Sequence, residues 1–133
     1  MPEKDTLKRA MNKKRRGKKP STQAGEFVRE EMHHIREGKH GARSTKQAIA
    51  IGLSKARRSG VNLPPPQKGK TSERTRTQAK RDYQKGRSRT ESKTARRRHQ
   101  ATLHALRREG RGAASREALS RQARQTARRR RAA

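Results

Sequence analysis

Large apolar residues are concentrated in the first half of the chain, where they recur with helical spacing. Twelve of the sixteen Val, Ile, Leu, Met, Phe and Tyr residues lie within residues 1–66. One stripe predicts a helix that begins at Ser21 or Thr22 and ends at Gly38, with Ala24, Phe27, Val28, Met32 and Ile35 on one side. A second stripe predicts a helix from Ser44 to Gly60, with Ala48, Ile49, Gly52, Leu53 and Ala56 on one side.

These two helices predict an amphipathic helical hairpin over residues 20–63. The connection between them has about six residues, as is common for antiparallel helices, and Gly52 in the middle of its stripe would let the two backbones approach closely. A unit of about 40 residues rarely folds alone. We therefore expect either that the N-terminal arm packs on the hairpin or that two copies form a homodimer through it.

Basic segments flank the hairpin. Residues 1–19 form a basic arm, with a short helix that would place Leu7, Ala10 and Met11 on one side. After the hairpin comes Pro64–Pro66, which neither a helix nor a strand can cross, so residues 64–70 are predicted to be a linker.

Residues 71–133 are predicted to be an Arg-rich tail with helix signals but little to bury. Ser88-Arg89-Thr90-Glu91 matches a capping box, and Ser115 can begin a last helix. A thin apolar stripe lies between them: Ala95, His99, Leu103 and Leu106. Because clustered positive charges repel one another, we expect the tail to be conditionally helical or disordered until anions neutralise it. The predicted fold class is all-α.

Charge and composition narrow the possible functions. The chain of 133 residues has 40 Lys and Arg against 11 Asp and Glu, a net charge of +29. Val, Ile, Leu and Phe together make up 12 of the 133 residues, about 9%. A highly charged chain tends to be disordered when this fraction is below roughly 20%. A deep apolar pocket is therefore not expected. No catalytic constellation or phosphate-binding loop is present, so no enzyme and no small-molecule substrate are predicted.

The same composition bears on where the protein works. There is no cysteine, and the longest apolar run has six residues, which excludes disulfides and a membrane span of about 20 residues. No secretory signal opens the sequence. We expect a cytoplasmic protein with no membrane partner, located on the nucleoid.

Clusters of Lys and Arg are the strongest functional signal, because each phosphate that they neutralise releases a counterion. The predicted partner is nucleic acid, with DNA favoured over RNA. The predicted contacts are Lys13, Lys14, Arg15, Arg16, Lys18, Lys19, Arg57, Arg58, Arg96, Arg97, Arg98, Arg107, Arg108, Arg111, Arg128, Arg129, Arg130 and Arg131.

The few aromatic residues indicate the manner of binding. Only Phe27 and Tyr83 are Phe, Tyr or Trp, so a platform on which unpaired bases could stack is essentially missing. We therefore expect sequence-independent, electrostatic DNA binding with compaction or bridging, as in histone-like nucleoid-associated proteins. Two alternatives remain: an RNA- or ribosome-associated protein, and an adaptor in which the near-neutral hairpin recruits a protein partner to nucleic acid.

Acidic and imidazole side chains gather on the first predicted helix. Glu30 and His34 are four residues apart, a spacing that can hold a metal, but no second ligand-bearing helix is apparent. We therefore predict no metal site and no cofactor. Glu31 falls within the apolar stripe, so it should pair with a basic side chain such as Lys55.

Three stretches resemble a family of small, highly basic bacterial proteins: residues 20–32, 37–60 and 105–124, together about half of the chain. The most specific part is Gln-Ala-Ile-Ala-Ile-Gly-Leu-Ser-Lys-Ala-Arg at residues 47–57. The family has no known function, so the resemblance implies a bacterial cytosolic origin and no mechanism. The tail is similar to linker histones in composition only.

Overall fold

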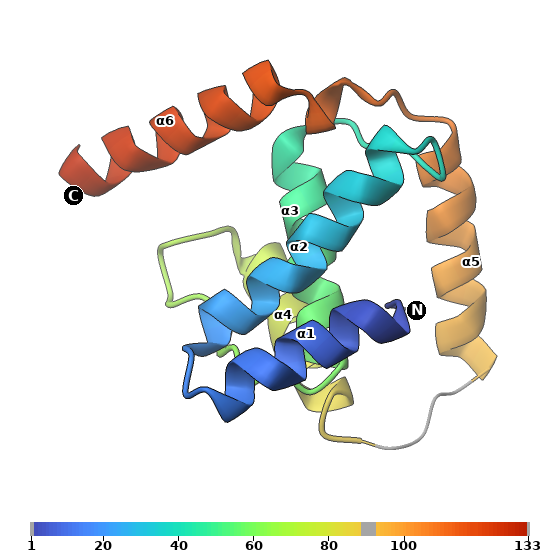
Figure 1. Ribbon diagram of the computed structural model, residues 1–133, viewed down its shortest axis with the longest axis vertical. Coiled ribbons are helices and arrows are strands. Elements are labelled where there is room, and N and C mark those ends of the chain that lie inside the picture. Colours follow the sequence, from blue (N-terminus) through green and yellow to red (C-terminus); the bar gives the residue numbers. More distant parts are fainter. Residues whose placement is uncertain (1, 89–92, 133) are drawn as a thin grey trace. The chain divides into compact units, whose positions relative to one another are not determined.

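The computed structural model describes residues 2–88 and 93–132, and these contain helices but no strand, which confirms the all-α prediction (Figure 1). The elements are α1 (Lys4–Arg15), α2 (Pro20–Arg36), α3 (Thr45–Arg58), α4 (Glu73–Lys85), α5 (Lys93–Arg107), the short 3₁₀ helix η1 (Gly112–Ala114) and α6 (Arg116–Ala132).

The chain divides into two compact units, and α2 and α3 each contribute to both. The first unit comprises residues 1–30 and 51–90, and the second comprises residues 31–50 and 91–133. Pro64–Pro66 therefore lies inside the first unit.

The first unit is built around a small core that includes the N-terminal arm. Its buried members are Ala10, Ala24, Phe27, Ala56 and Val61, with Leu53 and Leu63 packed against them. Since Ala10 belongs to α1, the arm packs as a helix on residues from α2 and α3, one of the two solutions expected for a hairpin too small to fold alone.

The side of α1 that faces this core differs from the predicted one. Thr6 and Ala10 are buried, whereas Leu7 and Met11 are 40% and 52% exposed. Charge explains the difference: Arg9 Nε and Lys13 Nζ lie 2.9 and 2.6 Å from the Glu26 carboxylate of α2. These ion pairs turn α1 so that a Thr and an Ala are buried, at the expense of its two largest apolar side chains.

Close approach of the backbones of α2 and α3 depends on Gly52. An added Cβ at this position would lie 2.7 Å from Val28 Cα and 2.9 Å from Val28 N. Neither backbone atom can move aside as a flexible side-chain end would. The sequence prediction for Gly52 is thus matched by a contact that excludes any side chain.

Most predicted helix ends follow the expected capping chemistry, but α2 begins at Pro20, so the predicted caps Ser21 and Thr22 lie inside the helix. Ser44 Oγ accepts a hydrogen bond from Gln47 N at 3.2 Å, and Ser115 Oγ accepts one from Ala118 N at 3.1 Å. Gly38 and Gly60, the predicted stops, have φ values of +78° and +96°. The capping box at Ser88–Glu91 includes residues 89–91, which lie outside the described residues.

Helix α4 was not predicted, because it buries little that is apolar. Its buried residues are Ala79 and Asp82. Asp82 Oδ2 accepts a hydrogen bond from Ser54 Oγ at 2.8 Å, and Asp82 Oδ1 lies 3.8 Å from Arg58 Nε. Polar contacts to α3 therefore hold α4 in the first unit.

The second unit ties the α2–α3 loop to the segment after α5. Gly41 N donates to Leu106 O at 2.7 Å, and Ala42 N donates to Gly110 O at 2.9 Å. A Cβ at Gly41 would lie 2.0 Å from the carbonyl oxygen of Glu109, so only glycine fits there. Backbone pairing thus joins segments about 65 residues apart in sequence.

The tail was predicted to be conditionally helical or disordered, and the structure does not confirm disorder in the part of the tail that belongs to this unit. Within residues 93–132, α5, η1 and α6 are helical. Thr45 Oγ1 donates to Ala113 O at 2.6 Å and Arg36 Nε donates to Ala114 O at 3.1 Å, so side chains of α3 and α2 anchor η1. The carbonyl groups of η1 give the Arg-rich segment contacts that its apolar content does not supply.

Candidate nucleic-acid interface

Most of the predicted phosphate contacts are exposed. Lys13 is half-buried and Arg57 is buried, whereas the remaining members of the set are exposed. Those in the first unit lie in the last turn of α1, directly after α1, or at the end of α3. Those in the second unit lie on α5, between α5 and η1, and on α6. Each unit therefore carries its own group of accessible cations.

Arg57 has a structural environment instead. The residue is 8% exposed, and its guanidinium donates to Leu63 O at 3.2 Å and to Pro64 O at 3.3 Å. Burial lowers the pKa of Arg57, while the charge of Asp82 partly opposes that shift. Because its donors hold the chain that follows α3, we leave Arg57 out of the candidate interface.

Some of the acidic side chains, by contrast, are buried. Of the ten acidic residues that the structure describes, four are buried: Glu26, Glu30, Glu31 and Asp82. Burial alone would raise the pKa of Glu26, but hydrogen bonds and charge from Lys13 and Arg9 outweigh it, so the pKa lies below its usual value. Burying carboxylates leaves the accessible surface with a larger excess of positive charge than the sequence composition implies.

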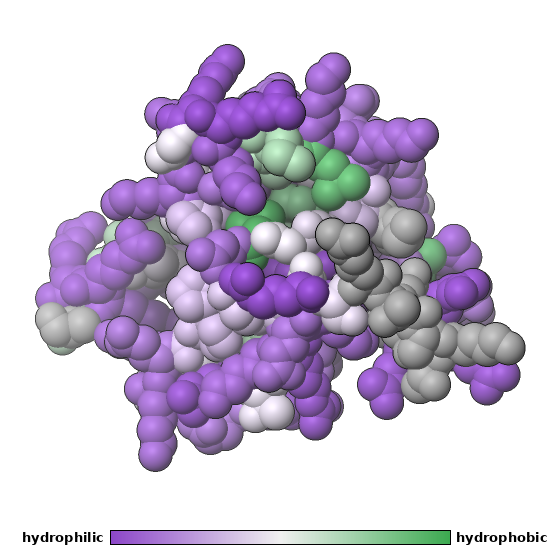
Figure 2. Space-filling view, turned by 90° about the horizontal axis from the view of Figure 1, so that it is seen from below, coloured by the Kyte–Doolittle hydropathy of each residue, from purple (hydrophilic) through white to green (hydrophobic). Residues whose placement is uncertain are grey.

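The surface reflects this arrangement. In the view of Figure 2, hydrophilic residues cover most of the visible face and hydrophobic residues form a small area. Together with the exposed Lys and Arg, such a surface suits contact with a charged backbone better than with an apolar partner.

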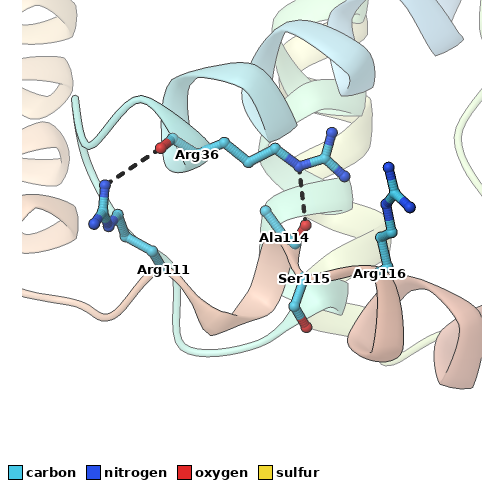
Figure 3. A pocket seen from close by; sticks show the side chains of 5 residues that line it. All are labelled: Arg36, Arg111, Ala114, Ser115 and Arg116. Atoms are coloured by element: carbon cyan, nitrogen blue, oxygen red, sulfur yellow. Dashed lines mark hydrogen bonds between the residues drawn. The ribbon is translucent and has the colours of Figure 1, made fainter.

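A hollow at the junction of η1 and α6 brings three arginines together. Its volume is about 460 Å³, and it is lined by Arg36, Arg111, Ala114, Ser115 and Arg116 (Figure 3). Arg36 Nε is held by Ala114 O, while Arg111 Nη1 donates to Arg36 O at 3.3 Å. The guanidinium groups of Arg36 and Arg116 lie on one side of Ala114, and Arg111 extends on the other.

This hollow has the chemistry of an anion site. Guanidinium groups bind phosphate oxygens in a planar, two-point geometry. The hollow also adjoins the N-terminus of α6, where the helix dipole favours negative charge and Ser115 already caps one amide. A backbone phosphate is the ligand that this arrangement suits.

Sequence reasoning identified Arg111 but missed Arg36 and Arg116. Arg36 ends α2, some 75 residues before Arg111. No local pattern marks it, because only the long-range contacts of η1 place it beside the other two. The runs of consecutive arginines were the available signal, and these three residues are not in one run.

The aromatic residues offer no free ring for stacking. Phe27 is 1% exposed, and the guanidinium carbon of Arg87 lies 4.4 Å from the ring centroid of Tyr83. Tyr83 also donates its hydroxyl to Asn62 Oδ1 at 2.6 Å. Both aromatic side chains are therefore engaged within the protein, in keeping with contact to backbone rather than to bases.

Carboxylate and imidazole groups gather near the end of α2. Lys55 Nζ lies 3.8 Å from Glu30 Oε2, and Glu3 N donates to Glu30 Oε1 at 2.5 Å. Glu31 Oε2 lies 3.0 Å from His40 Nε2. The imidazole of His40, from the loop after α2, is thus a partner of Glu31 that the sequence did not indicate.

Comparison with known proteins identifies a family but no activity. Residues 3–68, just under half of the chain, match the family of unknown function DUF6496. The predicted resemblance to an uncharacterised family is confirmed, although the stretch at residues 105–124 lies outside the match. Searches of the curated proteins and of the solved structures each found no match. None of the described helices is long and apolar enough to cross a membrane.

Proposed function

We propose that the protein binds the nucleic-acid backbone electrostatically and without sequence preference, with duplex DNA as its main ligand. The observation that carries the proposal is the separation of charge: the predicted cations are exposed except for Arg57 and the half-buried Lys13, while four carboxylates are buried. A surface of this kind neutralises phosphates and releases counterions.

The two units support a bridging or compacting role on the nucleoid. Exposed cations belong to both units, for example Lys18 and Lys19 in the first and Arg107 and Arg108 in the second. A chain with two cationic units can contact two duplex segments or two parts of one. Within the second unit, the hollow lined by Arg36, Arg111 and Arg116 supports the proposal as a candidate place for a backbone phosphate.

The proposal is tested by measuring binding to two unrelated DNA duplexes of equal length. Fluorescence anisotropy gives the affinity for each duplex at several salt concentrations. We expect equal affinities for both duplexes. If about eight phosphates are neutralised, affinity falls about 10³- to 10⁵-fold between 50 and 200 mM salt. A salt slope near zero, or a strong preference for one duplex, contradicts it.

Four further measurements separate the alternatives. Tighter binding to a structured RNA than to a duplex of the same charge, or crosslinking in cells to defined RNA positions, would replace DNA by RNA as the main ligand. A bead-bound duplex that captures a second, labelled duplex only in the presence of the protein supports bridging. Partners that remain bound after nuclease treatment would instead indicate the adaptor.

A further inference from the structure

Three side chains with metal-binding groups meet in the second unit: Glu31 and His34 of α2, and His40 of the loop that follows. One ligand atom from each lies within 4.8 Å of the other two. Glu31 is 0% and His40 5% exposed, and His34 is half-buried. Three residues of spacing place Glu31 and His34 on the same side of α2, and the turn after α2 brings His40 back to them.

The hydrogen bonding of His40 shows which of its ring nitrogens faces the cluster. Nδ1 lies 3.0 Å from Gly41 O, and because a carbonyl oxygen only accepts hydrogen bonds, Nδ1 carries a hydrogen. Nε2 then lies 3.0 Å from Glu31 Oε2. A neutral ring would point its lone pair at a carboxylate, so this contact requires either a proton or a cation between the two groups.

His34 favours the cation. A simple ion pair needs one imidazole, but the ring of His34 also stands edge-on to that of His40, with centroids 6.0 Å apart and an angle of 84°. A metal ion allows both rings to be neutral ligands, while Glu31 stays ionised.

The ligand set and its spacing suit zinc. Two imidazoles and one carboxylate are a common set for Zn²⁺, with a fourth position left for water. Bonds of about 2.0–2.1 Å in a tetrahedral site place neighbouring ligand atoms about 3.3 Å apart, close to the 3.0 Å between His40 and Glu31. The hydrogen bond from Nδ1 to Gly41 O is the usual support of a metal-bound histidine.

We propose that Glu31, His34 and His40 form a binding site for Zn²⁺ or a similar divalent transition-metal ion. The local charge is permissive: α2 has three glutamates against two arginines, a net charge of −1, whereas every other described α-helix is positive. The site uses none of the Lys and Arg residues assigned to phosphate contact. A test of metal binding is therefore independent of the proposed function.

Metal binding would stabilise the second unit. His40 precedes Gly41 and Ala42, whose amides pair with Leu106 and Gly110. An ion that joins His40 to α2 therefore fixes the loop on which the η1 segment rests. A ligand that binds only the folded state raises the melting temperature.

The test uses the full chain, freed of nucleic acid by nuclease and high salt and of metal by a chelator. Zn²⁺ is titrated by calorimetry, and Co²⁺ by its visible absorption, which reports tetrahedral coordination. We expect one ion per chain and a higher melting temperature with Zn²⁺. We expect the Zn²⁺ affinity of His34→Gln to be at least about 100-fold lower, a larger loss than the removal of a residue that only supports a metal ligand causes. We expect the same loss for His40→Gln.

His33→Gln is the matched control, because His33 is the exposed neighbour of His34 on α2 and lies outside the cluster. Its affinity stays that of the unchanged protein. The absence of Zn²⁺ binding at micromolar concentration, or equal binding by His34→Gln, would overturn the site and leave an ion pair between His40 and Glu31. If His40→Gln does not fold, the Zn²⁺ affinity of His34→Gln decides whether the site exists, because His34 is only half-buried.

Discussion

The charge of Glu26 helps to hold the N-terminal helix on α2. Its side chain is 7% exposed and pairs with Arg9 and Lys13, which are themselves 41% and 36% exposed. We expect Glu26→Gln to lower the free energy of unfolding by about 1–2 kcal/mol, the cost of charged hydrogen bonds reduced by solvent screening. Urea unfolding at pH 7 measures this effect.

The same variant predicts a pH dependence. The pKa of Glu26 is lower in the folded than in the unfolded chain, so its carboxylate stabilises the fold above the unfolded pKa of about 4.3. This contribution is lost as pH falls through the folded pKa. The difference between the unchanged protein and Glu26→Gln should therefore shrink below about pH 4. Glu37→Gln is the control, because Glu37 is 57% exposed and should change stability little at either pH.

Arg57 and Arg58 are neighbours with opposite predicted roles. Arg57→Gln removes a buried guanidinium that donates to Leu63 O and Pro64 O, and we expect a loss of about 2 kcal/mol of stability with no change in the salt slope of DNA binding. The exposed Arg58 lies 3.8 Å from Asp82, so Arg58→Gln should cost less than about 1 kcal/mol. It should also reduce the salt slope by about 0.9. Equal effects of the two substitutions on DNA binding would contradict this division.

At the scale of one residue, sequence shows charge but not accessibility. Arg57 and Arg58 look alike in the sequence, and only the return of the chain at residues 63–64 buries one of them. Glu31 was correctly expected to need a partner because it interrupts an apolar stripe. The imidazole of His40 could not be inferred, since it depends on the path of the loop after α2.

At the scale of helices, the contact between α2 and α3 gives a matched pair of glycine variants. Glycine to alanine within a helix usually stabilises by about 1 kcal/mol, as we expect for Gly25→Ala, where a Cβ meets nothing within 4 Å. At Gly52 the Cβ would meet the backbone of Val28 at 2.7 Å. Gly52→Ala should therefore destabilise by about 1–3 kcal/mol. Thermal and urea unfolding of both variants measure the signs, and a stabilised Gly52→Ala would contradict the close approach.

Periodicity predicts helices where apolar residues determine the packing, and fails where polar contacts do. Helices α2 and α3 lie where their stripes indicated, with Phe27, Ile35, Ala48 and Ala56 buried. The prediction of which side of α1 is buried was wrong for Leu7 and Met11, because the ion pairs of Glu26 stabilise the helix more than burial of these two side chains would. Helix α4 was missed because Asp82 is one of its two buried residues.

At the scale of the molecule, the candidate interface was only partly predictable. Runs of arginine are visible in sequence, and composition alone indicates a polyanionic partner. The hollow of Arg36, Arg111 and Arg116 is not visible, because η1 must first dock on the ends of α2 and α3 through Ala113 and Ala114. Long-range hydrogen bonds of this kind produce no periodic pattern in the sequence.

The last cluster, Arg128–Arg131 on α6, tests whether charge alone governs binding. All four residues are exposed, and the last turn of a helix favours cations even without a ligand. If each neutralises one phosphate, replacing all four by Gln should reduce the salt slope by roughly 3 to 4. Replacing them by Lys keeps the charge and should leave the slope unchanged, although the loss of two-point contacts weakens the affinity. A Gln variant with an unchanged slope would show that this end of α6 does not touch the phosphates, and would restrict the interface to the cations that precede it.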